Sequence, residues 1–124
     1  MTTGHADVDP AEYIAVVLPG GRAPEYLRND PHCQRVIRHF FAADKPVAQL
    51  CDGPLISAAA GVLSGRRSAA YPALAPDLTA VGAHFVDGEA VVDGTLVSGR
   101  AWPDHPAWMR EFIRILRAKA PVEG

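Results

Sequence analysis

The chain has 124 residues, of which 48% are hydrophobic and 21% charged, and its formal net charge is -2. This length predicts a single domain, and the balance of apolar and charged residues excludes an intrinsically disordered chain. A pI near 6.2 gives no basic footprint for nucleic acid, and no window is apolar enough for a membrane span. The first ten residues are polar and acidic, unlike a secretory signal, so we expect a cytoplasmic protein.

The two cysteines, Cys33 and Cys51, are too few for a disulfide framework. No Cys/His pairs stand at the spacing of a structural zinc site. We therefore expect free thiols and no bound metal.

Short apolar runs alternate with helical patterns along the chain. Strands are predicted at residues 13–18, 46–50, 66–71, 83–86, 90–92 and 95–97, and helices at 24–29, 31–41, 55–63, 76–82 and 106–118. Asp30 is a suitable N-cap for the second helix, and residues 87–88 and 93–94 (both Asp-Gly) are hairpin-turn signals. The continuous run at 13–18 predicts a strand buried on both faces. Alternating strands and helices predict an α/β fold with a largely parallel sheet.

The sequence around Cys51 carries the most chemical information. A strand, then Cys51-Asp52-Gly53-Pro54, then a helix of small residues is the arrangement of a nucleophile on a sharp turn. Gly53 allows close passage of the backbone, and N–H groups at the helix start can hold a developing oxyanion. The alternative is a buried cysteine that only packs at a strand end. Periodicity alone favours the buried cysteine, because free cysteines are commonly buried. The residues that flank the turn shift the balance toward a nucleophile.

Four segments resemble the PfpI branch of the ThiJ/PfpI superfamily. They are residues 16–25 (VVLPGGRAPE), 45–54 (KPVAQLCDGP), 58–67 (AAAGVLSGRR) and 91–100 (VVDGTLVSGR). The resemblance runs in order from about residue 13 to residue 116. It implies a flavodoxin-like three-layer α/β sandwich with a mostly parallel sheet, as a single domain over residues 13–118 with a flexible lead-in at 1–12 and a tail at 119–124. It also implies a homodimer or a higher homo-oligomer.

The resemblance implies roles for matched residues. Cys51 is the nucleophile, and the backbone N–H groups of Gly21 and Asp52 form an oxyanion hole. Asp52 and His105 are candidates to move protons, and the alternatives are a helix N-cap for Asp52 and a surface position for His105. Candidate pocket residues are Gly20, Arg22, Glu25, Gly53, Tyr71, Trp102, Asp104 and His105.

The sequence departs from the family pattern in two places. The family usually has a His directly after the nucleophilic Cys, where this chain has Asp52. A carboxylate there should raise the pKa of Cys51. We also expect the fold to be N-terminally truncated, because the family begins with a βα unit that supplies a central strand and a Glu beside the nucleophile.

Two functional hypotheses follow. The first is a cysteine-nucleophile enzyme, a cofactor-independent hydrolase or lyase, acting on a small carbonyl, amide or nitrile-like electrophile. The second is a truncated, catalytically weak protein that serves as a binding or assembly subunit. A redox role for Cys51 needs an exposed thiol of low pKa, and Asp52 argues against it.

Overall fold

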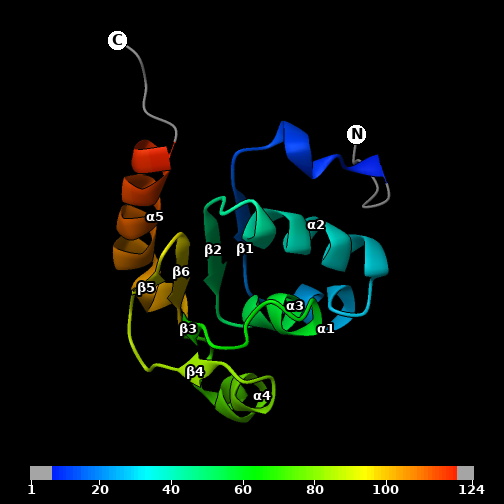
Figure 1. Ribbon diagram of the computed structural model, residues 1–124. Helices are drawn as coiled ribbons and strands as arrows, with labels where there is room; N and C mark the ends of the chain where they lie inside the picture. The colour runs from blue at the N-terminus through cyan, green and yellow to red at the C-terminus, as the bar shows by residue number, and fades with distance from the viewer. Residues whose placement is uncertain (1–6, 120–124) are drawn as a thin grey trace.

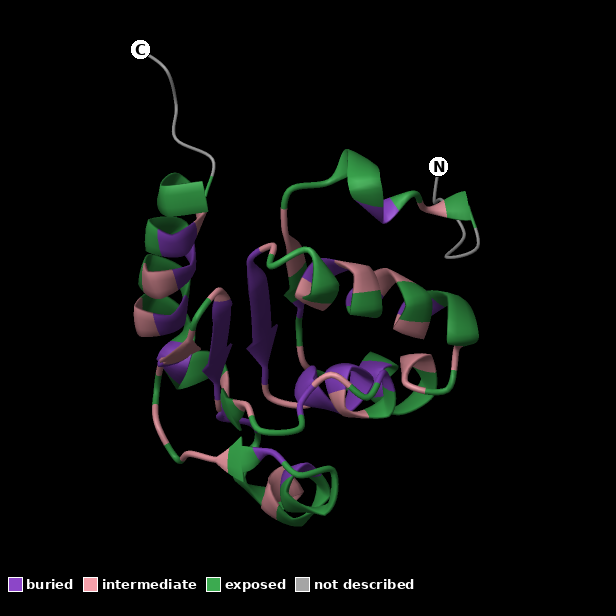
Figure 2. Ribbon diagram, in the orientation of Figure 1, coloured by how far each residue is buried: buried purple, intermediate pink, exposed green. Residues whose placement is uncertain are grey.

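Two parallel strands, β2 (Val47–Leu50) and β6 (Leu96–Gly99), form the buried centre of a four-stranded sheet. Figure 2 shows both strands buried along their length. The computed structural model describes residues 7–119. The sheet order is β1–β2–β6–β5, with β1 at Val16–Leu18 parallel to β2 and β5 at Val91–Asp93 antiparallel to β6. The predicted mostly parallel sheet is confirmed.

Helices cover both faces of this sheet (Figure 1). On one face lie α1 (Ala23–Leu27), α2 (Pro31–Ala42) and α3 (Pro54–Ala59), and on the other lies α5 (His105–Lys119). Strand alternation sends Val47 toward α2 and α3, while Ala48 points toward α5. The result is the three-layer architecture that the resemblance implies.

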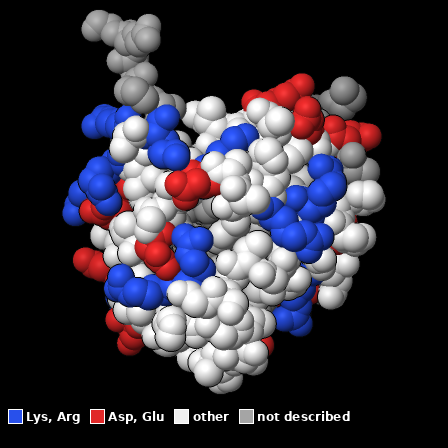
Figure 3. All heavy atoms as spheres, in the orientation of Figure 1, with Lys and Arg blue, Asp and Glu red and all other residues white. Residues whose placement is uncertain are grey.

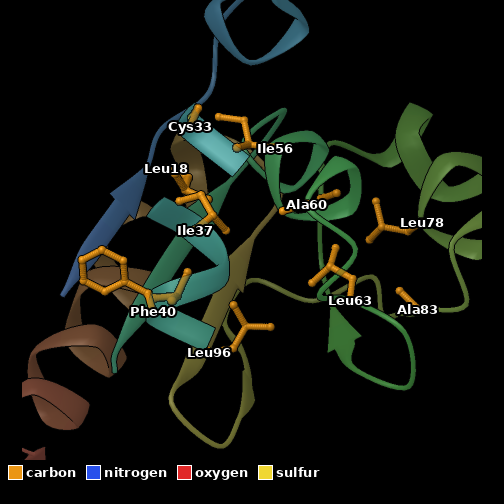
Figure 4. Packing of buried hydrophobic residues seen from close by; sticks show 12 residues of the cluster. Leu18, Cys33, Ile37, Phe40, Ile56, Ala60, Leu63, Leu78, Ala83 and Leu96 are labelled. Carbon is orange, nitrogen blue, oxygen red and sulfur yellow. The ribbon is translucent and has the colours of Figure 1, made fainter. Parts of the chain in front are cut away.

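The larger of the two cores lies between the sheet and α2, α3 and α4 (Ala75–Ala80). Leu18, Ile37, Ile56 and Leu96 belong to this core and are labelled in Figure 4. Ile37 and Leu96 are each 1% exposed. The smaller core packs Trp108, Phe112 and Ile115 of α5 against the opposite face of the sheet.

A second, two-stranded sheet corrects one predicted turn. β3 (Arg67–Ser68) and β4 (His84–Phe85) pair in parallel, so residues 87–88 do not form a hairpin. The turn at 93–94 does join the antiparallel strands β5 and β6, with Gly94 at φ +62°. An Asp-Gly pair signals a turn, but the strand that β4 joins is decided by tertiary packing.

Three other predicted elements differ from the structure. The helix expected over 55–63 ends at Ala59 because Gly61, at φ +78°, leaves the helical region. Only Arg67 and Ser68 of the strand expected over 66–71 pair as a strand. β1 begins at Val16 and is not buried on both faces, since Val17 is 43% exposed. Within residues 7–119, β1 pairs with β2 alone, which leaves its other edge uncovered by a strand.

Short 3-10 turns complete the chain. They lie at Pro10–Glu12, Pro72–Leu74 and Trp102–Asp104. Basic and acidic side chains are interspersed over the face shown in Figure 3, with arginines following α5. Among the described residues, no helix is long and apolar enough to cross a bilayer.

The N-cap predicted at Asp30 is confirmed, because its Oδ1 accepts the His32 N–H at 2.9 Å. We expect Asp30→Ala to lower the free energy of unfolding by about 1 kcal/mol, since it removes the acceptor for this N–H. Asp30→Ser keeps an acceptor and should lose less. Urea denaturation of the three proteins measures the difference, and equal losses from Ala and Ser would contradict the capping role.

Candidate functional site

The site is built around Cys51, in the turn that joins β2 to α3. Cys51 has φ +58°, in the left-handed region that non-glycine residues rarely adopt. Two main-chain hydrogen bonds hold it there. Its N–H donates to the Gly99 carbonyl at 3.2 Å, and its carbonyl accepts the Tyr71 N–H at 2.9 Å. A strained backbone fixed from both sides is typical of functional sites.

Two glycines make this turn sterically feasible. A Cβ on Gly53 would stand 2.2 Å from the Leu18 carbonyl oxygen, and one on Gly20 would stand 2.6 Å from the Cβ of Cys51. Real Cβ atoms do not approach other atoms so closely. The ends of β1 and β2 therefore meet only because both positions lack a side chain. This contact places the loop after β1 directly against the Cys51 sulfur.

Backbone N–H groups face that sulfur. The amides of Asp52 and Gly21 both hydrogen-bond to the Cys51 side chain, and each lowers its pKa. Burial and the charge of Asp52 act in the opposite direction and prevail, so the pKa of Cys51 lies above its ordinary value. Cys33 lies on α2 in the larger core. Its pKa is also raised, mainly by burial and secondly by the negative charge of Asp30.

Two acidic residues stand at the Cys51 turn. Oδ1 of Asp52 lies 3.9 Å from the Cys51 Sγ. Burial, followed by the charge of Glu25, raises the pKa of Asp52. Glu25 stands in the first turn of α1 and pairs with Arg22 at 3.9 Å. The structure thus brings together Cys51, Asp52 and Glu25, with Arg22 beyond them.

The Tyr71 main chain is part of this site through its bond to the Cys51 carbonyl. The Tyr71 side chain is 46% exposed, and Trp102 is 77% exposed. The His105 ring lies 5.8 Å from the Trp108 ring. Among residues 7–119, no hydrogen bond joins the Trp102 or His105 side chain to Cys51.

Asp104, a candidate pocket residue, instead hydrogen-bonds to Arg100. It is 4% exposed and accepts the Arg100 N–H at 2.8 Å and the Arg100 Nε at 2.9 Å. These hydrogen bonds hold the pKa of Asp104 below its ordinary value. Asp104 therefore anchors the chain between β6 and α5.

Sequence reasoning missed a buried polar network beneath the turn. Gln49, in the run interpreted as apolar, bonds with Ser57 and Ser68, and all three are fully buried. A glutamine inside an otherwise apolar central strand was the signal that could have found it. Gly99 was also missed. A Cβ there would stand 2.7 Å from Leu50 Cδ1, beside the carbonyl that holds Cys51.

Within residues 7–119, no group of three His, Cys, Asp or Glu side chains is placed to hold a metal ion. An apolar cavity of about 230 Å³ lies beside the site. It is lined by β1, by Gly20 in the loop that follows β1, and by residues of α1 and α2 that include Pro24 and Val36.

Residues 1–115 match the DJ-1/PfpI family model. The chain belongs to the DJ-1/PfpI family. It is 47% identical over 110 residues to Deglycase PH1704 of Pyrococcus horikoshii, covering 89% of this chain and 66% of that protein. It is 42% identical over 113 residues to Protein/nucleic acid deglycase 2 of Escherichia coli, covering 90% of this chain and 66% of that protein. The chain thus spans just under two thirds of the length of these two relatives.

A solved structure of the DJ-1/PfpI type shares the fold. It is a two-domain protein of Anabaena variabilis with a dj-1/thij/pfpi-like and a ferritin-like domain. It superposes with a TM-score of 0.88 at 28% identity, covering 97% of this chain and 34% of that one. The flavodoxin-like fold expected from the sequence is therefore confirmed.

The Asp104 anchor gives the molecule a defined acid sensitivity. A carboxyl whose pKa falls on folding stabilises the protein above its unfolded pKa of about 3.9, and the contribution disappears as pH falls through the folded value. We expect Asp104→Asn to lower the free energy of unfolding by about 1–3 kcal/mol at neutral pH, and by less near pH 3. Denaturation across this pH range measures the effect. Asp87→Asn, at an exposed partner of Arg100, is the control, and an equal loss at both pH values would contradict the anchor.

Proposed function

We propose that this protein is a cytoplasmic cysteine-nucleophile enzyme of the deglycase type, acting on a small carbonyl, amide or nitrile-like electrophile. The observation that carries the proposal is the left-handed Cys51 turn with the N–H groups of Gly21 and Asp52 against its sulfur. The names of the deglycase relatives support this class of chemistry. The proposal needs no metal or cofactor.

The nucleophilic step assigned to this site begins from a neutral thiol. The Cys51 sulfur adds to the electrophilic carbon, and the electron pair of the carbonyl moves to its oxygen. The Gly21 and Asp52 N–H groups then stabilise that oxygen. The thiol proton passes to the Asp52 carboxylate, 3.9 Å away. A raised pKa makes Asp52 a better base than an ordinary carboxylate.

The other pocket residues have supporting roles in this proposal. Gly20 leaves the Cys51 sulfur uncovered, and Gly53 allows the ends of β1 and β2 to meet. Arg22 and Glu25 set the charge at the mouth, and Tyr71 stands beside the turn as a hydrogen-bond donor to substrate. Trp102 and His105 remain candidates for the rim of the pocket.

Substitution of Asp52 shows whether its carboxylate acts as a general base or only raises the pKa of Cys51. In Asp52→Asn the charge that raises the Cys51 pKa is gone, so Cys51 should alkylate faster at a fixed pH than in the parent protein. If Asp52 is the base, turnover of a small α-oxoaldehyde or its amine adduct should nevertheless fall by 10²-fold or more, about the share of general base catalysis. Asp52→His should also increase thiolate character.

Cys51→Ala is the negative control for both measurements, and Cys33 provides the internal reference for alkylation. Faster turnover in Asp52→Asn would overturn the assignment of Asp52 as base. Absence of any Cys51-dependent turnover in the parent protein would instead favour the second hypothesis, a catalytically weak binding or assembly subunit. The raised Cys51 pKa is the observation that favours that alternative.

We also propose that the chain forms a homodimer or higher homo-oligomer through the β1 edge. Support comes from the exposed fractions of Tyr13 (51%), Ile14 (63%) and Val17 (43%), and from the apolar cavity beside β1. An uncovered strand edge offers unpaired N–H and C=O groups to another strand. A second copy presents the same edge and can pair with it across a two-fold axis.

Light scattering at micromolar concentration tests this assembly. The parent protein should be larger than a monomer, and Val17→Lys should shift it toward monomer, because a charge on an edge strand opposes pairing. Val81→Lys places the same charge on a comparably exposed valine outside β1 and should leave the size unchanged. A monomeric parent protein would contradict the proposal.

A further inference from the structure

A continuous chain of buried polar groups runs beneath the Cys51 turn. Ser57 Oγ donates to Gln49 Oε1 at 2.7 Å, and Gln49 Nε2 donates to Ser68 Oγ at 3.0 Å. Ser68 Oγ donates to the Ala69 carbonyl at 2.8 Å. The Ala69 N–H donates to Ser98 Oγ at 2.8 Å. This network, Ser57–Gln49–Ser68–Ala69–Ser98, joins α3, β2, β3 and β6.

Burying any of these polar side chains without a hydrogen-bond partner would cost free energy, so the hydrogen bonds restrict the position of each one. Gln49, Ser57, Ser68 and Ser98 all have 0% exposure. Among the described residues, no buried side-chain nitrogen or oxygen lacks a hydrogen-bond partner. A buried polar network that is fully satisfied rigidifies the elements it joins, because any shift leaves a group unpaired.

The elements that the network joins are those that hold Cys51. Gln49 lies two residues before Cys51 in β2, and Ser57 lies in the helix that follows the turn. Ser98 precedes Gly99, whose carbonyl accepts the Cys51 N–H. Ser68 and Ala69 lead to Tyr71, whose N–H donates to the Cys51 carbonyl. Gly99 and Tyr71, the two residues that hydrogen-bond to the main chain of Cys51, therefore lie one and two residues from the nearest member of the network.

We propose that Gln49 is a positioning residue, which holds the Cys51 turn and the N–H groups around its sulfur through buried hydrogen bonds to Ser57 and Ser68. It does not touch the sulfur or a substrate. Its amide is the only group of the network that bonds with two other side chains, Ser57 in α3 and Ser68 in β3. Apolar packing alone could bury β2, but it would not fix α3 and the segment after β3 at one distance from the turn.

Loss of the Gln49 hydrogen bonds should change the apparent pKa of the Cys51 thiol. The Gly21 and Asp52 amides stabilise negative charge on the Cys51 sulfur only while they are aimed at it. A looser turn should weaken these bonds and raise the apparent pKa of Cys51 further. Alkylation reports this directly and needs no substrate, so its result does not depend on the proposed enzymatic function.

Gln49→Met tests the proposal, because methionine fills a similar volume without polar atoms. At a fixed pH near 8, Cys51 should alkylate about three- to tenfold more slowly than in the parent protein, the factor that corresponds to one ordinary hydrogen bond. Its pH profile should shift upward, while that of Cys33 should not. Ser98→Ala, at the far end of the network, should change Cys51 in the same direction.

Phe40→Leu is the control for lost stability alone. Phe40 is 2% exposed and lies in the last turns of α2, near the beginning of β2 and away from Cys51. This variant should lower the melting temperature and leave the Cys51 profile unchanged. If Gln49→Met lowers only the melting temperature, as Phe40→Leu does, the positioning role is wrong.

Ser57→Ala extends the test if Gln49→Met does not fold, because it removes one bond and keeps the amide of Gln49. It should slow Cys51 alkylation by a smaller factor. Where both variants fold, combining them should slow the reaction by less than the product of the two separate factors, since both remove the same bond. An unchanged profile in Ser57→Ala, or multiplicative factors in the double variant, would overturn the proposal.

Discussion

The close approach of two backbone segments at Cys51 determines the rest of the site. The end of β1 and the end of β2 lie so near each other that side chains at Gly20 and Gly53 would collide with the opposite strand. Cys51, between them, adopts a left-handed conformation that costs roughly 1–2 kcal/mol for an L-residue. The surrounding fold must supply that energy. It does so through hydrogen bonds to Gly99 and Tyr71.

Two opposing electrostatic effects meet on the Cys51 sulfur. Amides from Gly21 and Asp52 favour the thiolate, whereas burial and the Asp52 carboxylate favour the thiol. The second pair prevails. In the mechanism that we propose, the Asp52 carboxylate, 3.9 Å from the Cys51 sulfur, accepts the thiol proton as the sulfur attacks.

Much of the fold could be predicted from local sequence signals, because these signals act over a few residues. The Asp30 cap, the turn at 93–94 and the buried run before Cys51 all depend on neighbouring residues, and all three are present. The partner of β4 and the exposure of Val17 depend on which strands become neighbours in the sheet, which no local pattern contains. At the site, the turn was predictable from its residue types. The hydrogen bonds of Gln49 to Ser57 and Ser68 were not, since they depend on how α3 and β3 pack against β2.

Gln49 shows why an apolar reading of a central strand is incomplete. Hydrophobic burial is proportional to area and has no direction, so it holds β2 in the core without fixing its neighbours to a fraction of an ångström. Hydrogen bonds are directional, and a buried one that is broken leaves two unsatisfied groups. A strained turn that must present N–H groups to one sulfur atom needs this second kind of constraint. The polar residue two positions before Cys51 is therefore better understood as part of the turn than as an exception within the core.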